Sequence, residues 1–313
     1  MPNPKPGESR DDFLDRCIPQ VIEEGREPDQ AVAMCISYYE GYKDKAFDVP
    51  QDGQIEYWKA FDRQRESFLP KYERKFAQAI RKQLEPFENA QSLGDLRINL
   101  DNKPVEEVYL DLYKEVGDKF ARTTWQGLKK MPYPEIKQEP TWIERMIYWA
   151  RVGQRIELVN DETRRQIELI IQKALEEGLS VQETVDLIVG TTDLPALNGN
   201  IFVRARRIAR TEIIAASNAG SLEGARSTGL QLKKQWLSTP DSRTRGTDPE
   251  DKWNHRQYVD TPFIVDINEP FVMRGTEKGQ PKIDRLQFPG DPQGSPGNVI
   301  NCRCTQIYIT PES

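Results

Sequence analysis

The sequence predicts a predominantly α-helical α+β fold, in which long N-terminal and central helices precede a small C-terminal α+β domain with short strands. Apolar residues recur at three- and four-residue spacing over long stretches before residue 230, which is typical of amphipathic helices. Beyond residue 230, Pro, Gly and Asp become frequent and the apolar runs shorten. The length of 313 residues corresponds to about two domains, and 11 Phe, 11 Tyr and 6 Trp can supply their cores.

Residues 1–50 are expected to form a short helical leader. After a Pro-rich start, Ser9 is a candidate N-cap for a helix that Pro19 interrupts. Cys17 and Cys35 each fall on an apolar face, which favours buried structural cysteines. Four cysteines in 313 residues do not indicate a disulfide framework.

Residues 51–135 are expected to form a helical region. Pro70 is expected to kink or restart the long amphipathic helix at 52–86. A second helix follows over 105–120, and the proline-rich stretch "KKMPYPEIKQEP" then reads as a linker. The apolar face of the first helix is marked by Ile55, Trp58, Phe61, Phe68, Tyr72, Phe76, Ile80 and Leu84.

The third region, 136–313, is expected to be helical up to about residue 230. It opens with two helices, "TWIERMIYWARVGQRIELV" and "DETRRQIELIIQKALEEG". Gly178 suits the C-terminal cap of the second, and Ser180 with Glu183 forms a capping box for the next helix.

A long helix is expected from Phe202 to Leu230, followed by short strands and loops over 231–313. Gly220 and Gly224 lie four residues apart on this helix, a spacing that lets another backbone approach closely. The stretches "KKQWLST", "FIVDI" and "CTQIYIT" are the candidate strands.

Four stretches occur in a recognisable order: "ARTEIIAASNAG", "KQWLSTPDSRTR", "PFIV" followed by "FPGDP", and "INCRC". Together they resemble the phage Mu protein F-like family, the minor head or head-morphogenesis proteins of tailed bacteriophages. The resemblance covers roughly residues 140–313. It implies a structural role in head assembly and in DNA packaging or ejection. It also implies a place in the virion, in the capsid interior or at the portal vertex, after assembly in the host cytoplasm.

The resemblance implies protein partners: the portal protein, the major capsid protein and the scaffold protein, with packaged DNA as a further candidate. Arg204, Arg206 and Arg207 are the residues that could contact DNA or an acidic portal surface. The alternative interpretation, pairing within the chain plus a solvated face, is the favoured one. A formal net charge of −6 argues against a general role in coating DNA.

The two cysteines of "NCRC" raise the question of a metal site. Many members of the family have a Cys-x-x-Cys after the Asp-x-Arg-Thr region and a His before the final Cys-Arg-Cys, and this sequence has neither. Cys302, Cys304 and His255 remain as soft ligands, with Asp241 or Asp291 as candidate fourth partners. In a strand the two cysteines point to one face, which suits either zinc or an apolar core. No cofactor is expected, and zinc is the alternative.

A structural motif of charged and amide side chains is expected in the same stretches. The guanidinium groups of arginines 243, 245 and 303 are expected to pair with Asp241, Asp291 or Glu212, and such pairs fix the register of distant segments. The cluster should tie the C-terminal strands to the long helix. Its members are Arg210, Glu212, Asp241, Arg243, Arg245, Asp291, Asn301 and Arg303.

Enzyme motifs are missing from the sequence. There is no Walker A sequence, no Gly-rich dinucleotide fingerprint and no His-Glu-x-x-His. The single histidine lacks the context of a Ser-His-Asp hydrolase, and no Glu-x-Glu pair follows "ARSTG" as an ADP-ribosyltransferase would require. The expectation is therefore a protein without enzymatic activity. The alternative is a cytoplasmic phage-encoded effector or enzyme, ADP-ribosyltransferase-like or hydrolase, that uses the same domain.

No membrane association is expected, because no run of about 18 apolar residues occurs.

Overall fold

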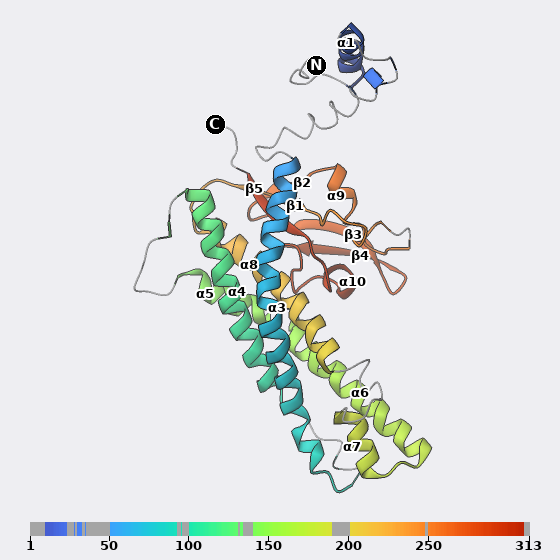
Figure 1. The fold of residues 1–313 in the computed structure, drawn as a ribbon. Coiled ribbons are helices and arrows are strands. Elements are labelled where there is room, and N and C mark those ends of the chain that lie inside the picture. The colour runs from blue at the N-terminus through green and yellow to red at the C-terminus, as the bar shows by residue number, and fades with distance from the viewer. Residues whose placement is uncertain are drawn as a thin grey trace. The chain divides into compact units, whose positions relative to one another are not determined.

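The computed structural model describes residues 10–23, 28, 30–32, 35, 51–92, 95, 100–130, 132–133, 140–189, 201–247 and 250–309. Contacts group the chain into two compact units, Met1–Ala60 and Phe61–Ser313. The domain boundaries expected after residues 50 and 135 stay predictions. Figure 1 shows the elements in chain order, and within the second unit the strands gather in the C-terminal part of the chain.

In the first unit, helix α1 (Arg10–Glu23) continues through Pro19, so the expected interruption is wrong. The buried face of α1 packs with Ala31. The helix continues past Pro19 because this face stays apolar on both sides of the proline. Cys17 and Cys35 are buried, as expected, but they are joined in a disulfide, with their Cα atoms 6.0 Å apart. The sequence did not predict this bond between the two buried structural cysteines. The candidate cap Ser9 lies outside the described residues.

Helix α3 (Gln51–Glu88) is one helix with Pro70 inside it, so the expected restart is wrong. The helix continues because the side chains flanking the proline are held by packing, Leu69 and Tyr72 both being buried. The hydroxyl of Tyr72 also donates to Glu115 of α4 (Lys103–Lys129) over 2.6 Å.

Helix α8 (Ile201–Arg226) lies directly against α4, as the two glycines predicted. A Cβ atom on Gly220 would lie 2.2 Å from the carbonyl oxygen of Gly117, and one on Gly224 would lie 2.2 Å from that of Ala121. Both neighbours are backbone atoms of α4. The close approach of two backbones is therefore confirmed, and only glycine permits it at these positions.

The helices between α4 and α8 differ from the expected pair in where they break. The chain turns at Gly153, whose φ is 81°, and not near Asn160. Gly178 adopts the left-handed C-cap and Ser180 and Glu183 exchange capping hydrogen bonds, so both predicted signals are confirmed. The elements are α5 (Trp142–Arg151), η3 (Val152–Gln154), α6 (Arg155–Glu177) and α7 (Val181–Val189).

The three candidate strands all form, and they make one antiparallel sheet in the order β2-β1-β5. A β3–β4 hairpin was not predicted; it turns at Lys278 and Gly279, which both have positive φ. The predominantly helical α+β class is thus confirmed. The elements are β1 (Lys233–Leu237), α9 (Gln257–Asp260), β2 (Phe263–Asp266), β3 (Phe271–Glu277), β4 (Gln280–Leu286), α10 (Pro296–Val299) and β5 (Thr305–Ile309).

Apolar side chains from both sheets enclose one core around Trp236 and Phe271, and Cys302 and Cys304 belong to it. Within the described ranges, no helix combines the length and the apolar character needed to cross a membrane.

Candidate metal centre

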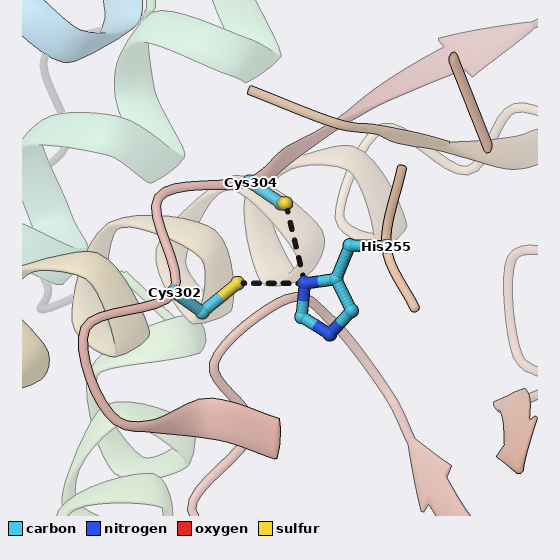
Figure 2. Close-up of side chains that lie close together, drawn as sticks. All are labelled: His255, Cys302 and Cys304. Carbon is cyan, nitrogen blue, oxygen red and sulfur yellow. Dashed lines mark hydrogen bonds between the residues drawn. The ribbon is translucent and has the colours of Figure 1, made fainter. Parts of the chain in front are cut away.

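Three soft ligands converge in this core. His255 Nδ1 lies 3.7 Å from Cys302 Sγ and 3.6 Å from Cys304 Sγ, as Figure 2 shows. All three side chains are buried, and their ligand atoms lie within 4.8 Å of one another. The two cysteines are two residues apart in the short segment that leads into β5. The structure therefore brings together the three residues that the sequence singled out.

The ring of His255 is oriented by a chain of amide and carboxylate groups. Its Nε2 lies 2.7 Å from Asn298 Oδ1, and Asn298 Nδ2 donates to Asp284 over 2.8 Å. Because the amide nitrogen of Asn298 faces the carboxylate, its oxygen accepts from Nε2–H. The lone pair of Nδ1 then faces the thiols, which is the tautomer that a metal or a thiol proton requires.

The surroundings shift the pKa values of the two thiols in opposite directions. A hydrogen bond to Cys304 and burial raise the pKa of the Cys302 thiol well above its usual range. Burial also opposes ionisation of Cys304, but the neighbouring thiol and His255 outweigh it and lower the pKa of Cys304 well below its usual range. Metals bind cysteine in its thiolate form.

The spacing of the donors fits a tetrahedral zinc ion. Bonds of about 2.3 Å to sulfur and about 2.0 Å to nitrogen, set at the tetrahedral angle, separate the two donor atoms by roughly 3.6 Å. The separations from His255 to Cys302 and Cys304, 3.7 and 3.6 Å, match that value. Within the described part of the chain, three side chains supply the site, so a fourth position is left for another donor. The arrangement is compatible with zinc.

The two aspartates considered as fourth ligands are engaged elsewhere. Asp241 receives both guanidinium nitrogens of Arg303, over 2.8 and 2.6 Å. This hydrogen bonding holds the pKa of Asp241 well below its usual range. The carboxylate of Asp291 accepts the backbone N–H groups of Gln287 and Gln293. Neither aspartate reaches the thiols, so both suggestions are wrong.

The pair that Arg303 forms with Asp241 is one of those that the sequence predicted. Arg243 adds a longer contact to the same carboxylate, 3.2 Å, from a side chain that is 75% exposed. Arg245 instead donates to the carbonyl of Ile300, so its expected carboxylate partner is wrong. The loop is therefore also held by a hydrogen bond from an arginine side chain to a main-chain carbonyl group.

The tie between the C-terminal segments and α8 uses other residues than expected. Glu212 pairs with Arg155 of α6 over 2.8 Å, and Arg155 also donates to the carbonyls of Gly290 and Asp291. The buried Glu212 is thus linked to the "PGDP" loop through α6, and not through the arginines of "DSRTR" or "NCRC". Since Arg155 lies 57 residues from Glu212, no local pattern indicated it.

The remaining motif residues make smaller contributions. Asn301 donates its backbone N–H to Thr211 Oγ1 over 3.3 Å and has a φ of 56°. Arg210 lines a small depression beside Asp62 and Arg303. These contacts place "NCRC" next to the "IARTE" stretch of α8.

Sequence reasoning missed Asn218, which is buried in the "SNAG" stretch of α8. It donates to the carbonyls of Pro289 and Cys304 and accepts from the hydroxyl of Thr305 over 2.8 Å. Arg65 of α3 donates to the same amide oxygen over 2.8 Å. An amide side chain among the small residues of α8 was the available signal, since a buried polar group requires hydrogen-bond partners.

The arginines at the start of α8 do not form one basic face. Arg204 donates to Val159 O on α6, whereas Arg206 lies 4.0 Å from Glu73 on α3. Arg207 is exposed. Contact of these arginines with DNA or with the portal therefore stays a prediction.

Comparisons with known proteins found two relatives. The chain is 24% identical over 253 residues to the uncharacterized protein YqbB of Bacillus subtilis, a match that covers 76% of this chain and 77% of that protein. It is 29% identical over 162 residues to the NAD(+)–arginine ADP-ribosyltransferase EFV of Enterococcus faecalis. That match covers 51% of this chain but only 28% of the transferase. No family model and no solved structure matches the chain.

The likeness to the transferase corrects the expectation that the protein has no enzymatic activity. That expectation was drawn from missing motifs, and the matched protein is an enzyme that shares sequence with half of this chain. Missing signatures of well-known enzyme classes therefore do not exclude activity here.

Proposed function

We propose that the chain is a minor head protein of a tailed phage or prophage, which binds the portal and inner capsid and assists head assembly and DNA packaging or ejection. The observation that supports this proposal is the convergence of the four stretches that carry the resemblance to the Mu F-like family. They are scattered between residues 209 and 304, and they pack together as one unit.

Specific contacts join these stretches pairwise. Arg303 of "NCRC" pairs with Asp241 of "DSRTR". Asn218, at the end of the "ARTE" stretch, donates to Pro289 O of "FPGDP" over 2.6 Å and to Cys304 O over 3.1 Å. Residues that share an ordered motif and also share contacts are expected of a single inherited domain. The portal protein, the major capsid protein and the scaffold protein are its proposed partners, with packaged DNA as a further one, and the virion its proposed location.

Zinc is the proposed ligand of the His255–Cys302–Cys304 site. A zinc ion there would join the segment before α9 to the segment before β5, which are otherwise linked through side-chain contacts. In this role the metal stabilises the fold and carries no chemistry.

The experiment that tests the head proposal is deletion of the gene from the phage or prophage that encodes it, followed by complementation. Quantitative mass spectrometry of purified procapsids and virions should find a few copies per particle, and deletion should lower the infectious titre. Wild type and Arg243→Ala should restore the titre, because Arg243 is largely exposed. Arg303→Ala should restore it less well. Absence of the protein from both particles would refute the proposal.

A second candidate function, ADP-ribosyl transfer, is favoured by the likeness to the Enterococcus faecalis enzyme. Incubation of the purified chain with labelled NAD⁺ and an arginine-rich acceptor protein tests it directly. Transfer of label to the acceptor protein would support the activity. A parallel reaction with a catalytically dead variant of a known transferase in place of this chain should give no transfer. No transfer, together with presence in virions, would leave the structural role alone.

A further inference from the structure

The first unit, Met1–Ala60, contains a covalent cross-link that the proposed function does not use. The Cys17–Cys35 disulfide has a sequence separation of 18 and joins helix α1 to the chain that follows it. Both cysteines are fully buried. They belong to the apolar core of this unit, whose buried members among the described residues are Phe13, Cys17, Val21, Ala31 and Cys35. The bond therefore lies inside the core and not on the surface of the unit.

The first unit is small for a fold that is stable without a cross-link. It ends at Ala60, and its residues from Gln51 onward belong to helix α3. Domains of about 60 residues are marginally stable, and much shorter ones usually need a disulfide, a metal or a partner subunit. Helix α1 has 14 residues, a length at which an isolated helix is marginal in water, and Pro19 removes one of its hydrogen bonds. The stability of α1 therefore depends on what it is joined to.

A disulfide acts mainly on the unfolded chain, because it restricts the conformations that the unfolded chain can adopt. For a loop of about 15–20 residues, the ratio of folded to unfolded molecules rises roughly a hundred-fold. In a marginal unit, a change of that size decides which of the two states is populated. Reduction of the Cys17–Cys35 bond should therefore unfold α1.

We propose that the first unit is a redox switch: α1 is unfolded while Cys17 and Cys35 are thiols, and it folds when the two sulfurs are joined. The oxidant is a small-molecule disulfide, such as glutathione disulfide. The Cys17 thiolate attacks one sulfur of glutathione disulfide, and one glutathione leaves. The Cys35 thiolate then attacks Cys17 Sγ in the mixed disulfide, and the second glutathione leaves. Two cysteine thiols are oxidised, one disulfide is reduced, and the two thiol protons end on the two released glutathione thiols.

The surroundings that the chain meets supply the two states of the switch. Glutathione and thioredoxin keep thiols reduced in the cytoplasm, whereas disulfides form and persist outside the cell. Under the proposed function, on which this step rests, the chain is assembled in the host cytoplasm and leaves it inside a virion. Cys17 and Cys35 are then thiols during assembly and become joined after release.

Limited trypsin digestion of the full chain tests the switch through the bond between Arg16 and Cys17. This bond lies within α1 and Cys17 is fully buried, so trypsin can cut it only after the helix has opened. Chain purified with dithiothreitol throughout should be cut there at least ten-fold faster than chain treated with glutathione disulfide. The reductant is removed just before digestion, and mass spectrometry measures the rate of each cut.

The bond between Lys119 and Phe120 is the internal control. It lies in α4 of the second unit, and Phe120 is fully buried. Its rate should be the same in both samples, and the ratio of the two rates corrects for any loss of trypsin activity.

Variants separate the disulfide from other effects of oxidation. The double variant Cys17→Ser/Cys35→Ser should be cut after Arg16 as fast as the reduced wild type under both conditions. Cys302→Ser is the matched control, because it removes a thiol that is free and lies in the second unit. It should keep the ten-fold difference of the wild type at Arg16.

Labelling with iodoacetamide tests the timing in particles. Cys17 and Cys35 should be labelled in procapsids from cells lysed in the reagent and protected in purified virions. The switch is overturned if oxidised and reduced wild type are cut after Arg16 at the same rate, or if Cys302→Ser abolishes the difference. Its timing is overturned if both particles carry the same thiol state. Absence of the protein from both particles refutes the head proposal alone, because the digestion still decides whether the switch exists.

Discussion

Replacing Gly220 with alanine should destabilise the second unit, although alanine is the better helix former. The added Cβ atom would lie 2.2 Å from the carbonyl oxygen and 2.7 Å from the Cα atom of Gly117. Both are backbone atoms of α4, so no side-chain rotation relieves the contact. The two helices would have to separate by about 1 Å along a well-packed interface.

The expected size follows from two opposing terms. Alanine gains roughly 0.8–1 kcal/mol over glycine inside a helix. Overpacking of a core costs roughly 1–3 kcal/mol, and a backbone contact that short should reach or exceed the upper end. The net loss in the free energy of unfolding should therefore be about 2 kcal/mol or more.

Gly127 offers a matched control, because it lies on α4 and a Cβ atom there would meet nothing within 4 Å. Gly127→Ala should raise the free energy of unfolding by roughly 0.8–1 kcal/mol, since only the propensity acts. Urea unfolding followed by circular dichroism measures both variants. The close approach of α4 and α8 at Gly220 is refuted if Gly220→Ala is as stable as the wild type. It is also refuted if both variants change the free energy of unfolding in the same direction.

Three further predictions concern charged and metal-binding groups. Arg155→Met leaves Glu212 buried without its cation and should lower the free energy of unfolding by about 3–5 kcal/mol. Arg151→Met breaks an exposed pair and should lower it by less than about 1 kcal/mol. Equal losses in urea unfolding would contradict the role of burial. Burial lowers the pKa of Lys234 to about 7. The unfolded chain therefore binds more protons between pH 7 and 9, and wild-type stability should rise with pH there by up to about 2 kcal/mol relative to Lys234→Met; parallel pH curves would contradict this. Zinc should raise the melting temperature of the wild type and not of Cys302→Ser, and an equal shift in both would exclude the site.

Helices were predictable where burial has a helical period. The face of α3 and the glycine pair of α8 are local patterns, and both were read correctly. Proline misled the prediction at Pro19 and Pro70, because the cost of one lost hydrogen bond is outweighed by side chains buried on either side. The β3–β4 hairpin was missed because polar side chains fill most of its positions, and only Phe271 and Met273 of β3 are buried.

The candidate metal centre was predictable in its ligands but not in its support. Cys302 and Cys304 are two residues apart, and His255 is the single histidine, so chemistry alone selected them. The orientation of the imidazole depends on Asn298 and Asp284, which come from α10 and β4. Such tertiary positions follow from packing between segments, which one sequence does not display.

The position of Arg65 has a consequence for how the chain folds as it leaves the ribosome. Arg65 donates to Ser217 and Asn218 on α8, and to the carbonyls of Arg303 and Cys304. The last bond joins residues 239 apart. At about 5–20 residues per second, Arg65 is made roughly 10–50 s before its final acceptor. The nascent helices must therefore keep this guanidinium hydrated, and docking of the final strand is the event that closes the core around it.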